Sequence, residues 1–143
     1  MALEITGFQR SWIAGGTAGV AGSDLSVAAT VNSISCPNGY QYMFVKFAAG
    51  LLVPIAAAAD NAVGVLQNKP APGQAGTVMI SGVTRVRASD AGIIVGSPVY
   101  IDAFGMVTRT AASNHFVGIA EEAAASASGF MIAICLKPFG ALA

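Results

Sequence analysis

The chain has 143 residues, 55% of them hydrophobic, which suffices for one compact domain with a buried core. Only 10% of the residues are charged, and seven Lys and Arg residues balance seven Asp and Glu residues. A surface with so little charge attracts phosphates and anionic lipid weakly, so we expect neither nucleic acid nor a membrane as partner. A net charge near zero instead favours association with other proteins or with further copies of the chain.

Membrane insertion and secretion have no support in the sequence. The longest charge-free stretch, residues 25–45, contains Asn32 and Pro37 and is not the run of about 20 apolar residues that a membrane helix needs. The N-terminus lacks the basic segment of a secretory signal, so we expect folding in a cytoplasm. Cys36 and Cys135 are too few for a disulfide framework or a zinc site, and we expect two buried free thiols.

Residues 1–29 mix glycine, alanine and serine around a few bulky side chains. The glycines between positions 15 and 19 would weaken any helix, so the composition predicts an extended arm. The bulky side chains of this arm favour its binding to another molecule, since burying each of them contributes about 1.5–3 kcal/mol. They are Phe8, Trp12 and Ile13. We therefore expect the arm to contact a neighbouring molecule.

Residues 30–143 read as a β-rich body, because short runs of Val, Ile, Phe and Tyr alternate with Gly, Pro, Asn and Ser. Gly82 predicts a bend or bulge that divides the longest run into two strands. One helical turn over residues 123–128 is the only helix expected. The predicted strands are residues 30–35, 41–48, 51–55, 62–67, 77–88, 98–102, 106–109, 115–121 and 130–137.

The two halves of this body resemble each other. The segments Gly50-Leu51-Leu52 and Val63-Gly64-Val65 are echoed after about 54 residues by Gly105-Met106-Val107 and Val117-Gly118-Ile119. Each half then ends on a run that begins with glycine, at Gly76 and at Gly129. The echo predicts a small β-barrel or β-sandwich with an internal pseudo-repeat, in which Gly64 and Gly118 occupy equivalent places.

Catalytic and cofactor motifs are absent from the sequence. The single histidine, His115, has no Gly-x-Ser-x-Gly elbow to activate, and Glu121 and Glu122 are strand neighbours that point to opposite faces. Zinc-type clusters, calcium loops and phosphate-binding glycine loops are missing. We therefore expect a protein that is not an enzyme and binds no metal or cofactor. The remaining aspartates are expected to cap turns: Asp24, Asp60, Asp90 and Asp102.

Two groups of residues are candidates for contact with a partner. In the arm, Arg10 and Trp12 are of the residue types most enriched in interface hot spots, and Phe8 and Ile13 flank them. In the body, Arg85 and Arg87 are two residues apart on one predicted strand and would line a positive strip. A solvated strand face is the alternative reading of these two arginines.

Four blocks between Tyr40 and Pro138 resemble the small head-decoration, or capsid cement, proteins of tailed bacteriophages. The blocks are Asp60-Asn61-Ala62-Val63-Gly64-Val65; Gly76-Thr77-Val78 with Ser81-Gly82-Val83; Gly96-Ser97-Pro98-Val99-Tyr100-Ile101-Asp102 with Gly105-Met106-Val107-Thr108; and Val117-Gly118-Ile119-Ala120-Glu121. Ser97 departs from the acidic residue expected after the glycine, and the arm has no counterpart in the pattern.

This resemblance implies a β-rich module without cofactors that sits on the outer face of an icosahedral shell. Such modules bind the major capsid protein, often as trimers at three-fold positions, and stabilise the shell against the pressure of the packaged DNA. One alternative is another phage component, such as a tail or spike module. Another is an enzyme or soluble ligand-binding barrel, which would need a convergent polar pocket that the sequence does not suggest.

Overall fold

The computed structural model describes residues 8–57, 60–111, 115–124 and 130–136. Within these ranges the chain forms eleven β-strands and no helix, which confirms the all-β prediction. The strands are β1 (Phe8–Ile13), β2 (Ala29–Val31), β3 (Ile34–Cys36), β4 (Phe44–Ala48), β5 (Leu51–Pro54), β6 (Ala62–Leu66), β7 (Ala75–Ala88), β8 (Pro98–Ile101), β9 (Val107–Thr108), β10 (His115–Ala120) and β11 (Phe130–Leu136).

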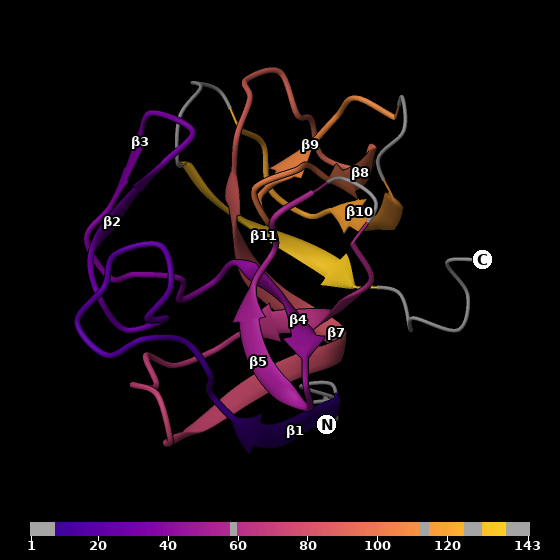
Figure 1. Ribbon diagram of the computed structural model, residues 1–143. Coiled ribbons are helices and arrows are strands. Elements are labelled where there is room, and N and C mark those ends of the chain that lie inside the picture. The colour runs from indigo at the N-terminus through magenta and orange to yellow at the C-terminus, as the bar shows by residue number, and fades with distance from the viewer. Residues whose placement is uncertain (1–7, 58–59, 112–114, 125–129, 137–143) are drawn as a thin grey trace.

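Nine of the strands belong to one continuous sheet. Its order is β11-β10-β8-β9-β7-β6-β4-β5, and β1 pairs with β7. Because β11 also pairs with β7, strands β7, β9, β8, β10 and β11 close into a five-stranded barrel. Figure 1 shows this barrel at the upper right, above β1, β4 and β5, with the separate β2–β3 hairpin at the left.

The strand order confirms the predicted pseudo-repeat. The path β5-β4-β6-β7 in the first half has the same antiparallel pairings as the path β9-β8-β10-β11 in the second. The registers also correspond, because Val45 faces Gly64 as Val99 faces Gly118. Each of these glycines lies at an irregularity in the pairing of its strand. Gly64 and Gly118 therefore occupy equivalent places, as the sequence predicts.

β1 is the counterpart of the C-terminal part of β7. β1 runs antiparallel to the start of β7, and Ala14 bridges in parallel to Leu52 of β5. The end of β7 runs antiparallel to β11, and Ala88 bridges in parallel to Val107 of β9. We call β1, β4, β5, β6 and the start of β7 the first unit, and the end of β7 with β8 to β11 the second unit.

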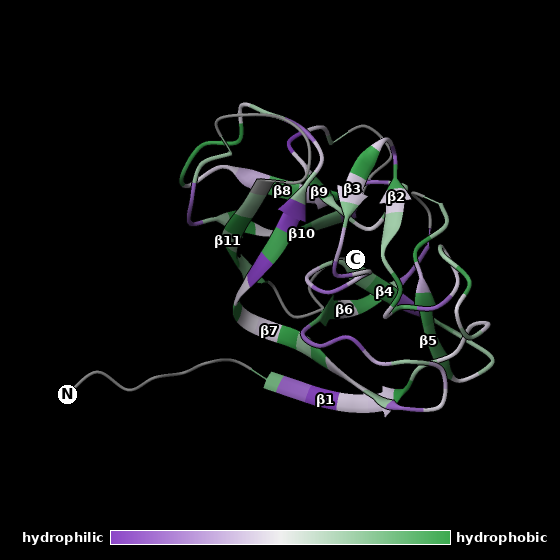
Figure 2. Ribbon diagram, turned by 90° about the vertical axis from the view of Figure 1, so that its left-hand side faces the viewer, coloured by the Kyte–Doolittle hydropathy of each residue, from purple (hydrophilic) through white to green (hydrophobic). Residues whose placement is uncertain are grey.

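Backbone hydrogen bonds close both units in the same way. The N–H of Gly15 donates to the carbonyl of Leu52 at 2.8 Å, and the N–H of Ser89 donates to the carbonyl of Val107 at 2.9 Å. Residues 8–14 of the predicted arm are therefore extended but pair within their own chain, whereas residues 17–27 of the arm form turns. In Figure 2, β1 lies along the outside of β7 at the lower edge of the molecule.

The two units have separate cores with matching positions. The inward residues of the first unit belong to one buried cluster and those of the second unit to another. In the first unit, residues 15–43 add material with no counterpart of equal length, and the β2–β3 hairpin packs its apolar side chains on that core. The matching core positions are Ala14 and Ala88, Val45 and Val99, Leu52 and Val107, Leu66 and Ala120, and Val78 and Ile134.

Two strand predictions are wrong in detail. The run 30–35 is a hairpin rather than one strand, because Asn32 and Ser33 adopt φ values of 50° and 64° between paired Val31 and Ile34. The run 77–88 lies in a single strand, β7, although Gly82 has φ of 100° and the partners change from β1 and β6 to β11 around it. Residues 125–128 of the predicted helical turn lie outside the described residues.

Candidate interaction surfaces

β1 brings the four candidate residues of the arm to one edge of the first unit. Phe8 is 57% exposed, and the exposed Arg10 places its guanidinium carbon 5.4 Å from the centre of the Trp12 ring. Trp12 itself is half-buried, and its ring meets that of Phe47 edge to face at 5.1 Å. Arg10 and Trp12 therefore contact each other, ordered by a cation–π contact and an aromatic contact, and their role in an interface stays a prediction.

An open pocket of about 330 Å³ lies between β1 and the β4–β5 turn. The partly exposed apolar side chains of Ile13 and Leu51 line it, and the exposed Phe47 lies against Trp12, which also lines it. Sequence reasoning missed Phe47 and Leu51, since a strand and turn pattern does not reveal which of its apolar residues remain uncovered. The pocket is lined by Ser11, Trp12, Ile13, Gly50, Leu51 and Ala75.

The two arginines of β7 lie in different surroundings. Arg85 is exposed, whereas Arg87 retains only 8% of its exposure. The backbone N–H of Arg87 donates to the backbone carbonyl of Tyr42 at 3.0 Å. Burial raises the pKa of the nearby Cys36 thiol, and the Arg87 charge opposes this effect. Of the predicted strip, only Arg85 offers a positive charge at the surface.

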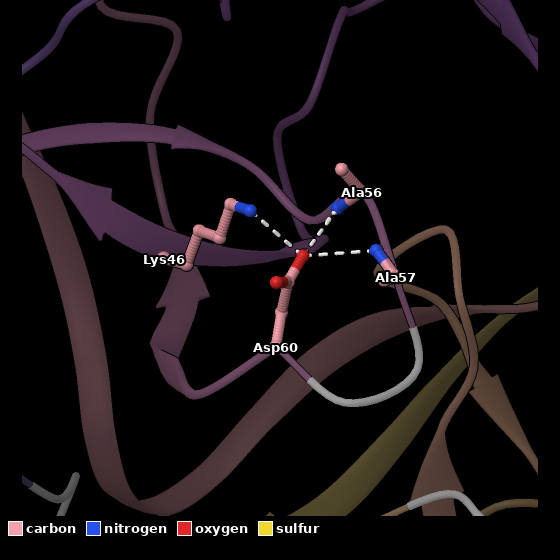
Figure 3. Close-up of polar contacts among 4 residues, drawn as sticks. All are labelled: Lys46, Ala56, Ala57 and Asp60. Carbon is pink, nitrogen blue, oxygen red and sulfur yellow. Dashed lines mark hydrogen bonds and ion pairs between the residues drawn. The ribbon is translucent and has the colours of Figure 1, made fainter.

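Asp60 organises the loop between β5 and β6 (Figure 3). Its Oδ2 accepts a hydrogen bond from Lys46 Nζ at 2.8 Å and from the N–H groups of Ala56 and Ala57 at 2.8 and 2.9 Å. The bond from Lys46 and the backbone donors hold the pKa of Asp60 below its usual value of 3.8. This carboxylate thus has a structural task in a turn, as expected.

The other three aspartates also bond to turns and strand ends. Asp24 accepts from Ser26 and from the N–H of Gly19, and these bonds lower its pKa. Asp102 accepts from the N–H groups of Phe104 and Met106, and Asp90 from the hydroxyl of Thr108.

Replacing Asp60 with asparagine is expected to lower the free energy of unfolding by about 1 kcal/mol at pH 7, since a charged acceptor is lost. Because the folded pKa is depressed, the stabilisation is present above pH 3.8 and is lost as the pH falls through the folded pKa. Thermal melts across pH 2–7 should show the two proteins converging in acid. The matched control is Glu121→Gln on an exposed side chain; a difference for Asp60→Asn that persists unchanged at low pH would contradict the assignment.

Groups for chemistry are sparse in the part of the chain that the structure describes. No three His, Cys, Asp or Glu side chains there lie close enough to hold a metal ion. A helix of membrane-spanning length and hydropathy was likewise not found among these residues. Both cysteines are free; Cys36 is buried, but Cys135 is exposed, so the expectation of two buried thiols is wrong for Cys135. The reason is alternation along β11, where Ile134 and Leu136 point into the core.

Two related β units with apolar side chains on their outer surfaces define an all-β protein over the described residues. Comparison with known families assigns it more closely: residues 44–136, more than half of the chain, match the phage cement protein family, and the chain belongs to that family. The match begins at β4 and ends at β11. Comparison with curated proteins gives no match. The family is one of structural proteins and places this chain in the phage capsid, which confirms the resemblance seen in the sequence.

Proposed function

We propose that this protein binds the outer surface of a phage capsid as a homotrimer and stabilises the shell against the pressure of the packaged DNA. The family match over residues 44–136 carries the proposal. Its partner is the major capsid protein, which it meets on shells assembled in the host cytoplasm. Neither nucleic acid nor a membrane takes part, in keeping with a chain in which only 10% of the residues are charged.

The outer end of β1 is the contact with the shell in this proposal. Phe8 is the most exposed large apolar side chain of β1, and the contact of Arg10 with Trp12 orders the Arg10 side chain. A bulky apolar group beside an ordered arginine has the composition of an interface hot spot. β1 also lies outside the matched range of residues 44–136, so this contact is a feature of the present chain.

Binding to undecorated shells tests the proposal. The double substitution Phe8→Ala/Arg10→Ala should weaken co-sedimentation with shells at least about tenfold while circular dichroism stays unchanged, since both side chains are exposed. Phe104→Ala/Arg109→Ala is the matched control, because it removes the same two exposed residue types from the second unit. Wild-type protein that binds tails rather than shells would contradict the function, and weaker binding by the control alone would contradict the contact surface.

A further inference from the structure

One row of side chains on the first unit contacts the second unit. Phe44, Val65 and Met79 lie side by side across β4, β6 and β7 through the pairs Phe44–Val65 and Val65–Met79. All three are buried, and they belong to the same cluster as the core of the second unit. We call them the junction row, because the second unit covers them.

The second unit contributes the turn between β8 and β9 to this contact. The carbonyl of Gly105 accepts a hydrogen bond from the N–H of Phe44 at 2.8 Å. Met106, the next residue, is completely buried and belongs to the core cluster of the first unit. The contact is therefore head to tail: the turn of the second unit meets Phe44 at one end of the junction row, and its Met106 side chain enters the core of the first unit.

The second unit carries its own version of the junction row. Ile119 pairs with Pro98 on β8 and with Cys135 on β11, in the registers that relate Val65 to Phe44 and Met79. Pro98 and Cys135 are exposed, and Ile119 is half-buried. Val83, paired with Cys135, is 48% exposed. We call Pro98, Ile119 and Cys135 the second-unit row; it is an uncovered apolar strip across three strands, and Val83 on β7 extends it.

The first unit likewise carries an uncovered version of the turn. Leu51 follows Gly50 in the β4–β5 turn as Met106 follows Gly105, and both glycines have positive φ. Whereas Met106 is completely buried, Leu51 is 38% exposed on the wall of the pocket beside β1. Each chain therefore has one unused row and one unused turn, on opposite units.

We propose that copies of this chain associate head to tail, with the second-unit row of one copy against the Leu51 turn of the next. The contact between the units of one chain provides the geometry, and a head-to-tail contact that closes forms a ring. The second-unit row and Leu51 carry no charge, which fits an apolar contact between copies. Pro98 has no N–H, so the hydrogen bond made by Phe44 is not repeated. The inference extends the proposed homotrimer and rests on it for the size of the ring.

Cross-linking in the absence of shells tests this arrangement. In the proposed arrangement, Leu51→Cys introduces a thiol beside the second-unit row of the next copy, which contains the native Cys135, and a short bis-maleimide should then join most chains into closed oligomers on denaturing gels. Cys36 is buried and its pKa is raised, so it reacts slowly. Leu51→Cys/Cys135→Ser is the control and should give monomers. Oligomeric protein without the cross-link, or protein that stays monomeric, would overturn the proposal.

A second variant avoids any dependence on the new cysteine. Cys135→Arg places a large charge in the second-unit row and should weaken self-association at least about tenfold by sedimentation. Ser35→Arg on the exposed side of β3 is the matched control and should leave it unchanged. If Cys135→Arg leaves self-association intact, or if Cys135 is protected from labelling only on shells, the row does not bind a second copy. If Leu51→Cys forms the cross-link but the wild-type protein does not bind shells, the result would contradict the proposed function and leave the contact between copies supported.

Discussion

Gly118→Ala is expected to destabilise the protein by about 3 kcal/mol or more, and Gly64→Ala by a similar amount. A Cβ at Gly118 would overlap the carbonyl oxygen of Cys135 on β11, and a Cβ at Gly64 would overlap that of Met79 on β7. Both obstacles are backbone atoms of a paired strand, so relief requires that the strands move apart. Chemical denaturation of the two variants measures the effect.

The control for these substitutions is Gly73→Ala. Gly73 has φ of 88° but no atom within 4 Å of a Cβ, so alanine there meets only the cost of a left-handed backbone, about 1 kcal/mol. The two equivalent glycines should therefore cost clearly more than Gly73. Equal losses of stability at all three positions would show that strand separation is not the cause of the destabilisation at residues 64 and 118.

The same close approach explains why the repeat was visible in the sequence. A residue that must lack a Cβ is fixed by the backbone of its neighbour, so Gly64 and Gly118 remain in both units between β-branched residues. The turn glycines Gly50 and Gly105 add a second fixed point, since both have positive φ. Positions with a steric requirement are the ones that sequence comparison within one chain can detect.

The end of the repeat could not be aligned in this way. The sequence pairs Gly76 with Gly129, but the register that sets Val65 against Met79 and Ile119 against Cys135 makes Met79 the equivalent of Cys135. A different alignment of β7 with β11 imposes no steric requirement for a particular residue type, because each strand keeps its own inward-pointing residues. Gly129 itself lies outside the described residues.

The sequence also did not predict which side chains are buried by segments far away in the chain. Arg87 lies next to Tyr42 and Cys36, and only the folded chain brings residues so far apart in sequence together. Cys135 is exposed although its residue type is usually buried, since alternation along β11 leaves it outside. The hairpin turn at Asn32 is different, because asparagine readily adopts positive φ and its presence within the run 30–35 was a usable signal.

The sequence carried no such signal for the pairing of β1 within its own chain. Its counterpart at the end of β7 makes the same pairing with different residue types: Trp12 matches Val86, and Ala14 and Ala88 are the only identical core pair between residues 8–14 and the end of β7. The equivalence is one of backbone hydrogen bonds, which many sequences can make. Glycine-rich residues from 15 onward separate β1 from β4 and make it resemble a free arm.

Removing residues 1–14 is therefore expected to unfold the first unit. The deletion takes away all the ladder bonds between β1 and β7, the bridge from Ala14 to Leu52 and the packing of Trp12 on the core. At about 1 kcal/mol for each hydrogen bond and 1.5–3 kcal/mol for a bulky side chain, the loss amounts to much of a typical domain's 5–15 kcal/mol. The second unit closes through β7 and β11 and loses no strand.

Hydrogen exchange measures this outcome unit by unit. Amide protection in β4 and β6 should fall to that of an unfolded chain, whereas protection in β8, β10 and β11 should persist, because the closed barrel retains its partners. A deletion of residues 1–7, which leaves β1 intact, controls for truncation as such. If the longer deletion kept the wild-type protection pattern in β4 and β6, β1 would be an attachment to the first unit rather than its first strand.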